Sequence, residues 1–200
     1  MPSFEEYYRE LLKREGSEQC ELISVWDKNL INEISQDFEQ SVANSEFIDS
    51  FCKIRPNSSN QSIGNQVEVY AIDELNKHLK TYQIEKCPGA GYPDRILAKS
   101  NFRHIALEMK ATGGWNPNDS NRRVLTSSSK TLQAKFTAPI YHLICTIIYQ
   151  NTDQQYLIKT VRLDFIEPQT SVSIRLEASV SHKLLENKDH ESKCFPDQSV

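Results

Sequence analysis

The sequence lacks the cysteine patterns and the long hydrophobic runs that would each indicate a particular class of protein. Its five cysteines are scattered, with no CxxC pair and no histidine at zinc-finger spacing, so we expect reduced thiols and no structural zinc site. The amino-terminal residues contain no apolar stretch typical of a secretion signal, and no apolar run is long enough to cross a membrane. We therefore expect a cytoplasmic protein without a membrane partner.

The sequence also lacks an overall excess of positive charge. Its net charge of -4 argues against a protein that coats nucleic acid indiscriminately, while 38% hydrophobic and 25% charged residues are typical of a folded, soluble domain. Between Arg95 and Lys135, however, eight basic residues stand against two acidic ones. This middle stretch could face a polyanion.

The front of the chain, residues 1–56, is predicted to be helical. A capping box of Ser3 and Glu6 predicts a short helix that ends near residue 14, and Asp27 can cap a second helix that runs to about residue 44. A third helix, ending before Pro56, is suggested by Phe47, Ile48 and Phe51.

The next segment combines a helix with a hairpin. From residue 64 to residue 80 apolar positions recur at helical spacing. Glu68 lies on that apolar stripe, where a carboxylate is unexpected unless it has a specific role. Two strand-like runs at 94–98 and 102–112, joined by a three-residue turn, predict a β-hairpin.

The run 140–149 is rich in β-branched and aromatic residues, which predicts a buried, central strand. The other expected elements are a polar loop at 113–121, a helix from the 127–129 region to about 137, and strands at 156–165 and 171–177. Together they predict the α/β (α+β) class, with a central mixed sheet flanked by helices. We expect one domain, 1–200, made of a helical segment at 1–56, a core at 64–150, additional strands at 151–186 and a flexible tail at 187–200.

Three residues of the hairpin suit the hydrolysis of a phosphodiester. Glu108 and Lys110 lie two apart on one strand and so point to the same face, and the hairpin can bring Asp94 across from Glu108. Two carboxylates can bind a hard divalent cation, and a lysine beside them can orient or help to deprotonate the attacking water.

The residues Pro93-Asp94 and Glu108-Met109-Lys110 resemble the signature of the PD-(D/E)XK nucleases, a family that includes most type II restriction endonucleases. The resemblance covers residues 64–149 and implies a restriction-endonuclease-like core. It implies that Asp94 and Glu108 ligate the metal, that the carbonyl of Met109 adds a ligand, and that Lys110 is catalytic. It also gives Glu68 a catalytic role, because many members carry an acidic residue on the helix before the hairpin.

The resemblance implies a type II restriction endonuclease of a prokaryotic cytoplasm. Such an enzyme recognises a short sequence in double-stranded DNA and hydrolyses each strand with Mg²⁺, for which Mn²⁺ can substitute, leaving 5′-phosphates. Most of its relatives act as homodimers, which present two active sites to the two strands. Arg122, Arg123, Ser127 and Lys130 are candidates for phosphate contacts, although an ordinary helix cap explains the serine equally well.

Other interpretations stay open at this stage. Asp94 could be a turn residue, Glu108 and Lys110 a solvated strand face, and Glu68 a residue at the edge of its stripe. With the same chemistry, the chain could instead be a structure-selective nuclease resembling a junction resolvase, or a cleavage subunit. It could also be a nucleic-acid-binding module that keeps the fold without hydrolysis.

Overall fold

The computed structural model describes residues 1–14, 23–88, 92–114, 140–152, 155–175, 181–183 and 191–196. Within them the helices are α1 (Phe4–Arg14), α2 (Lys28–Asn44) and α3 (Asn60–His78). The strands are β1 (Phe51–Cys52), β2 (Gln83–Lys86), β3 (Arg95–Lys99), β4 (Phe102–Thr112), β5 (Tyr141–Thr152), β6 (Gln155–Ile166), β7 (Ser173–Arg175), β8 (Ser181–Lys183) and β9 (Glu191–Phe195).

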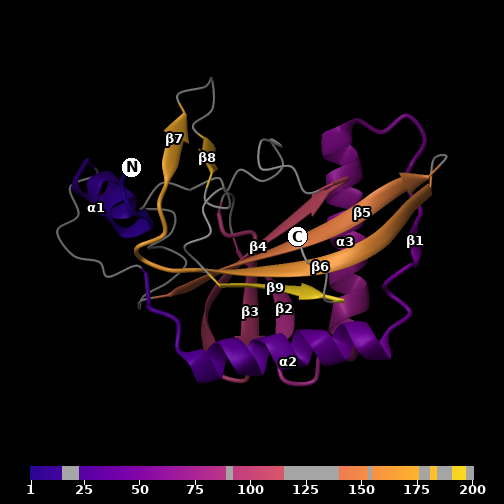
Figure 1. Ribbon diagram of the computed structural model, residues 1–200, viewed down its shortest axis with the longest axis horizontal. Coiled ribbons are helices and arrows are strands. Elements are labelled where there is room, and N and C mark those ends of the chain that lie inside the picture. Colours follow the sequence, from indigo (N-terminus) through magenta and orange to yellow (C-terminus); the bar gives the residue numbers. More distant parts are fainter. Residues whose placement is uncertain are drawn as a thin grey trace.

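A curled mixed sheet forms the centre of the molecule, and helices flank it (Figure 1). Its strand order is β1-β6-β5-β4-β3-β2, and β9 pairs with β6 outside this path. Strands β2, β3 and β4 form an antiparallel meander, β5 runs parallel to β4, and β6 runs antiparallel to β5. The predicted α+β class with a mixed sheet is therefore confirmed, as are the hairpin and the central position of the strand after residue 140.

The first two helices begin where the sequence indicated. At the start of α1 the peptide N–H of Ser3 donates to Glu6 at 2.9 Å and that of Glu6 donates to the Ser3 hydroxyl at 3.1 Å, which is a capping box. At the start of α2 the Asp27 carboxylate accepts from the peptide N–H groups of Asn29 and Leu30. Local capping chemistry therefore determines both helix starts.

The third helix predicted before Pro56 is wrong. Residues 51–52 form β1, which pairs with β6, and Asp49, two residues before β1, has a positive φ of 61° that interrupts any helix. The peptide N–H of Asp49 donates to the carbonyl of Ile158, and the Ile158 N–H donates to Ser50. Backbone bonds to a strand about a hundred residues away thus replace the local helical bonds that the apolar spacing suggested.

The flexible tail predicted from residue 187 is also partly wrong, because residues 191–195 form β9 in the main sheet. The strand holds Phe195 against the core and is joined to β6 by a hydrogen bond of 2.9 Å from the Arg162 guanidinium to the Ser192 hydroxyl. A segment of five mostly polar residues is too short to show the alternation of apolar and polar side chains that indicates a strand. Residues 187–190 and 197–200 lie outside the described ranges.

Side chains on the two faces of the sheet form two hydrophobic clusters. One face packs against α2 and α3, with Phe38, Val67 and Leu107 fully buried. The other face packs against Phe4 of α1 and Val172. None of the helices in the described ranges combines the length and the apolar character needed to span a membrane.

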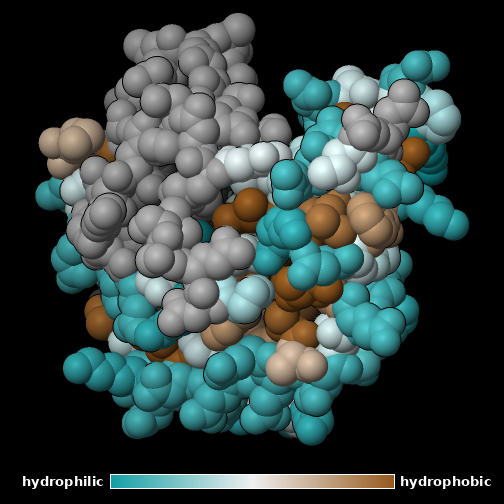
Figure 2. Space-filling view, turned by 45° about the vertical axis from the view of Figure 1, so that its right-hand side comes forward, coloured by the Kyte–Doolittle hydropathy of each residue, from teal (hydrophilic) through white to brown (hydrophobic). Residues whose placement is uncertain are grey.

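The face drawn in Figure 2 is largely hydrophilic, with hydrophobic side chains exposed between the hydrophilic ones. Figure 2 shows hydrophobic side chains above the hydrophilic row along the bottom of the molecule, where α2 lies in Figure 1. In this region of the molecule a groove of about 720 Å³ separates α2 from β9, and its lining includes Val42, Ile48 and Phe195. The α2 side of the sheet is therefore incompletely covered at β9.

Candidate active site

Strand β4 places Glu108 and Lys110 on one face of the sheet, as the period of two requires. The Lys110 Nζ lies 2.6 Å from Glu108 Oε1, and the side chains are 17% and 4% exposed. Leu107 and Met109 point the other way, into the cluster beneath α3. The two predicted residues thus form a buried ion pair rather than a solvated strand face.

The hairpin brings Asp94 to the same end of β4. Arg95 pairs with Leu107 in the antiparallel register, which puts Asp94, one residue earlier, at the level of Glu108. The Asp94 carbonyl accepts from the peptide N–H of Cys87 at 3.0 Å and so ties the turn to β2. Its carboxylate is exposed and available to a ligand.

Glu68 approaches the same place from α3. A hollow of about 270 Å³ is lined by Glu68, Asp94 and Met109, and by Asn65, Val69 and Arg95. Burial raises the pKa of Glu68 to about 7; Lys110 opposes this rise, while the charges of Glu108 and Asp94 add to it. These mutual effects mean that the structure brings together all four residues to which the sequence assigned catalysis.

The pKa values of both partners in the buried ion pair differ from their ordinary values. Burial raises the pKa of Glu108, and the neighbouring Lys110 ammonium opposes that rise. Burial alone would lower the pKa of Lys110, but the charge of Glu108 and its hydrogen bond outweigh burial and raise that pKa. Lys110 therefore remains a cation at neutral pH.

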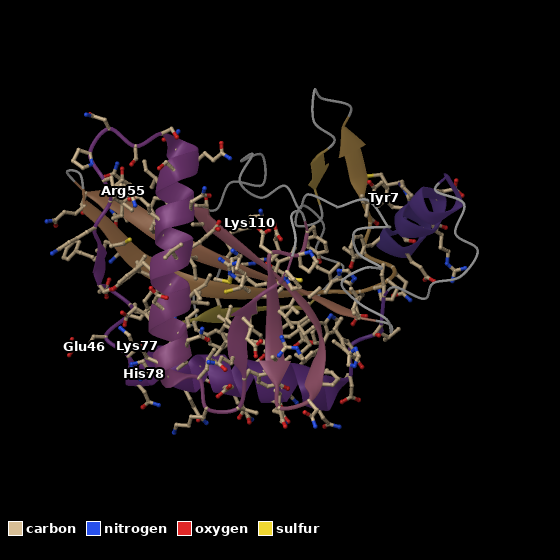
Figure 3. The ribbon with its side chains drawn as sticks, turned by 180° about the vertical axis from the view of Figure 1, so that it is seen from behind. Tyr7, Glu46, Arg55, Lys77, His78 and Lys110 are labelled. Atoms are coloured by element: carbon tan, nitrogen blue, oxygen red, sulfur yellow. The ribbon has the colours of Figure 1, made fainter. Side chains whose placement is uncertain are left out.

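Figure 3 shows Lys110 at the height of the upper half of α3, far from Lys77 and His78 at the lower end of that helix.

One oxygen of the pair is left without a partner. Glu108 Oε2 is buried and makes no hydrogen bond in the regions of the chain that the structure describes. A buried carboxylate oxygen without a donor is costly unless a ligand supplies the missing contact. Among the described residues, no three histidine, cysteine or acidic side chains are already arranged to hold a metal ion.

Arg122, Arg123, Ser127 and Lys130 lie outside the described residues, together with the loop and the helix predicted around them.

Tyr92 and His142 form a buried contact beside the motif, and the sequence had given neither residue a role. The Tyr92 hydroxyl and Nδ1 of His142 form a hydrogen bond of 2.6 Å, their rings are stacked, and both residues are buried. Phe4 meets the His142 ring edge-on, with centroids 5.0 Å apart. This contact joins β5 and α1 to the residue two positions before Asp94. A tyrosine directly before the Pro-Asp pair was the only signal for it in the sequence.

A second buried ion pair lies on the same face of the sheet, two strands away. Arg162 donates to Asp164 through Nε and Nη2 at 2.8–3.0 Å, and the Asp164 side chain is fully buried. In the register, Ile144 of β5 pairs with both Glu108 and Asp164. This face therefore carries one buried ion pair on β4 and another on β6, with the apolar Ile144 of β5 between them.

Comparisons of the chain with protein-family models and with curated proteins found no match.

Proposed function

We propose that this protein is a metal-dependent endonuclease of the PD-(D/E)XK kind that hydrolyses double-stranded DNA, acting as a type II restriction endonuclease. In this proposal it recognises a short sequence, leaves 5′-phosphates and works as a homodimer, so that each of two active sites cuts one strand.

The observation that carries the proposal is the convergence of Asp94, Glu108 and Lys110 at one end of β4. They are held by helix α3, the antiparallel meander β2-β3-β4, and β5 parallel to β4. This supports a restriction-endonuclease-like core, in which a helix, a three-stranded meander, a second helix and a further strand follow one another; the second helix was expected in a segment outside the described residues. A solvated strand face would not leave the Glu108 side chain only 4% exposed.

The donor set fits a hard cation such as Mg²⁺. Asp94 offers an exposed carboxylate, and Glu108 offers the buried oxygen that has no hydrogen bond among the described residues. Mg²⁺ is usually bound through one or two carboxylates together with water and substrate phosphates, so it does not need a cage of three side chains. Met109 lines the same hollow, where its carbonyl would be the third protein ligand.

The residues would divide the reaction among them. The metal ion, when bound, would lower the pKa of a water molecule and neutralise charge on the phosphate. Lys110, held as a cation by Glu108, would orient that water by donating a hydrogen bond and would stabilise developing negative charge. Its raised pKa favours this role over deprotonation of the water. Glu68 would be kept in its charged form by a nearby cation.

The first test is cleavage of phage or plasmid DNA with Mg²⁺ and with EDTA, comparing the wild type with Lys110→Ala. We expect discrete fragments from the wild type, none with EDTA, and a rate at least about 100-fold lower in the variant. If no DNA is cut with any divalent metal while DNA is still bound, the proposal is wrong and the binding-module interpretation replaces it.

Two further variants separate chemistry from folding. Lys110→Ala leaves Glu108 buried without its cation, which can cost about 3–5 kcal/mol of stability. Asp94→Asn removes a proposed ligand from an exposed position, so it should abolish cleavage in a folded protein. Lys99→Ala is the matched control, because Lys99 also forms an ion pair, with Glu33 at 2.7 Å, but lies on β3 away from the hollow. It should cut at the wild-type rate.

A further inference from the structure

Arg95 is a cation that lines the hollow, and the proposed reaction assigns it no role. It opens β3 directly after Asp94 and lines the hollow with Glu68 and Met109. Its charge lowers the pKa of Glu68, which places the guanidinium within electrostatic reach of the carboxylates.

The guanidinium of Arg95 keeps most of its hydrogen-bonding capacity. Among the described residues it makes one hydrogen bond, from Nη1 to the carbonyl oxygen of Asp94 at 3.0 Å. No carboxylate of the described chain lies within ion-pair distance of it. A guanidinium has five N–H donors in a planar fork, so several donors face the hollow or solvent.

The other cation of the site is differently placed. Lys110 is bound to Glu108 at 2.6 Å and is largely buried, so its charge is already balanced inside the protein. Arg95 is half-buried and has no such partner in the described regions of the chain. A polyanion that reaches the hollow would therefore meet the fork of Arg95 before it meets Lys110.

We propose that Arg95 binds a phosphate of the DNA backbone at the cleavage site, through two N–H donors of its guanidinium. This inference rests on the proposed nuclease function and names a substrate contact within it. An arginine fork matches two phosphate oxygens, and such charge-assisted pairs are the stronger class of hydrogen bond. The contact offsets the repulsion between the phosphate and three neighbouring carboxylates and keeps the backbone beside Asp94.

The test measures DNA binding over a range of salt concentrations, because each phosphate contact changes the salt dependence of the association constant. Labelled duplex DNA is titrated with protein in Ca²⁺, a hard cation with the same preference for oxygen, under conditions where the same samples are checked to be uncut. We expect Arg95→Ala to weaken binding about tenfold or more. We also expect it to reduce the slope of log K against log salt by about 0.9.

Two other variants identify the contact. Arg95→Lys keeps the charge and should keep the slope, while binding more weakly than wild type because it loses the planar fork. Arg103→Ala is the matched control: Arg103 lies on the same hairpin, paired with Glu85 at 2.6 Å, and about 16 Å along β4 from Glu108. Its removal should leave the slope unchanged.

The outcomes distinguish this inference from the proposed function. If the wild type binds and cuts DNA but Arg95→Ala keeps the wild-type slope, the phosphate contact is wrong and the nuclease proposal stands. If Arg95→Ala and Arg103→Ala lower the slope equally, the effect is a general one of surface charge, and the contact is also wrong. If the wild type neither binds nor cuts DNA, both proposals fail together.

Discussion

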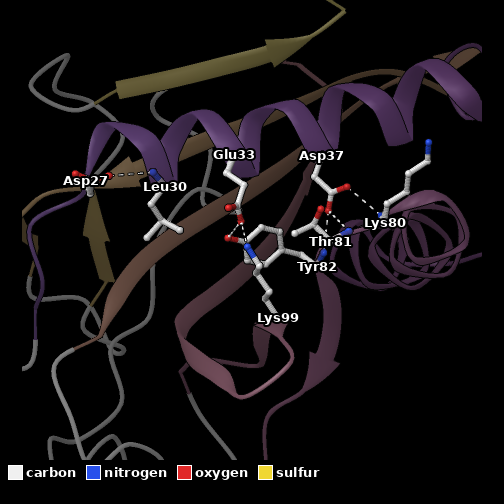
Figure 4. Close-up of polar contacts among 8 residues, drawn as sticks. All are labelled: Asp27, Leu30, Glu33, Asp37, Lys80, Thr81, Tyr82 and Lys99. Carbon is white, nitrogen blue, oxygen red and sulfur yellow. Dashed lines mark hydrogen bonds and ion pairs between the residues drawn. The ribbon is translucent and has the colours of Figure 1, made fainter.

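Asp37 offers the sharpest test of how the fold is held together. It lies on α2, is 5% exposed, and accepts three peptide N–H groups from the segment that connects α3 to β2 (Figure 4). Oδ1 accepts from Lys80 at 2.9 Å, while Oδ2 accepts from Thr81 at 3.1 Å and from Tyr82 at 2.9 Å. One carboxylate therefore fixes the entry into the meander that carries the proposed active site.

The replacement Asp37→Asn keeps the shape of the side chain and removes its charge. The amide oxygen can still accept from two peptides, but the amide nitrogen then faces the third N–H donor. One bond to a charged acceptor is lost, at about 1.5–3 kcal/mol, and two others weaken by about 1 kcal/mol each as they become neutral. Relief from burying a charge offsets part of this sum. We expect a net loss of about 3 kcal/mol.

Urea denaturation with linear extrapolation measures this loss, and an unchanged m-value would show that only stability has altered. The matched control is Glu33→Gln, one turn earlier on α2, whose carboxylate bonds Lys99 and Tyr82 at a half-exposed position. It should cost less than about 1 kcal/mol. If Asp37→Asn costs no more than the control, the three peptide bonds do not stabilise this connection.

Two further predictions concern other contacts. Tyr92→Phe keeps the ring stacked on His142 but removes the hydroxyl that bonds the buried Nδ1. The free energy of unfolding, measured with urea, should therefore fall by about 1–3 kcal/mol. An unchanged free energy of unfolding would contradict this prediction. Hydrogen bonds from Lys99 and then from Tyr82 lower the pKa of Glu33 below its ordinary 4.5. The stability difference between wild type and Glu33→Gln should therefore be constant above about pH 5 and vanish as the pH falls through the lowered pKa. A difference that persists at pH 2 would refute this.

Much of the local structure around the proposed site could be predicted from the sequence. The helical period of Val67, Ala71 and Leu75 indicated α3, and the structure buries all three. The two-residue spacing of Glu108 and Lys110 sufficed to put them on one face of a strand. Such periods are local, because a helix or strand repeats its side-chain direction over a few residues whatever the rest of the chain does.

The elements that the sequence analysis missed depend on distant partners. Gln83–Lys86 carries little apolar pattern, and it is a strand because it pairs with β3. Phe51 and Glu191–Phe195 likewise belong to strands because β6 offers them its free edge. Pairing of this kind is invisible in a window of a few residues, and it overrides weak local preferences.

The chemical types at the proposed site, the strand face that Glu108 and Lys110 share, and the hairpin that could reach Asp94 all follow from the order of the residues. The burial of Glu108, its pairing with Lys110, and the hollow that Glu68 and Arg95 line with Asp94 do not follow from it. They depend on how α3 and the meander pack in space, because packing sets both burial and the distance between charges. A pattern in the chain specifies directions along an element but no distances between elements.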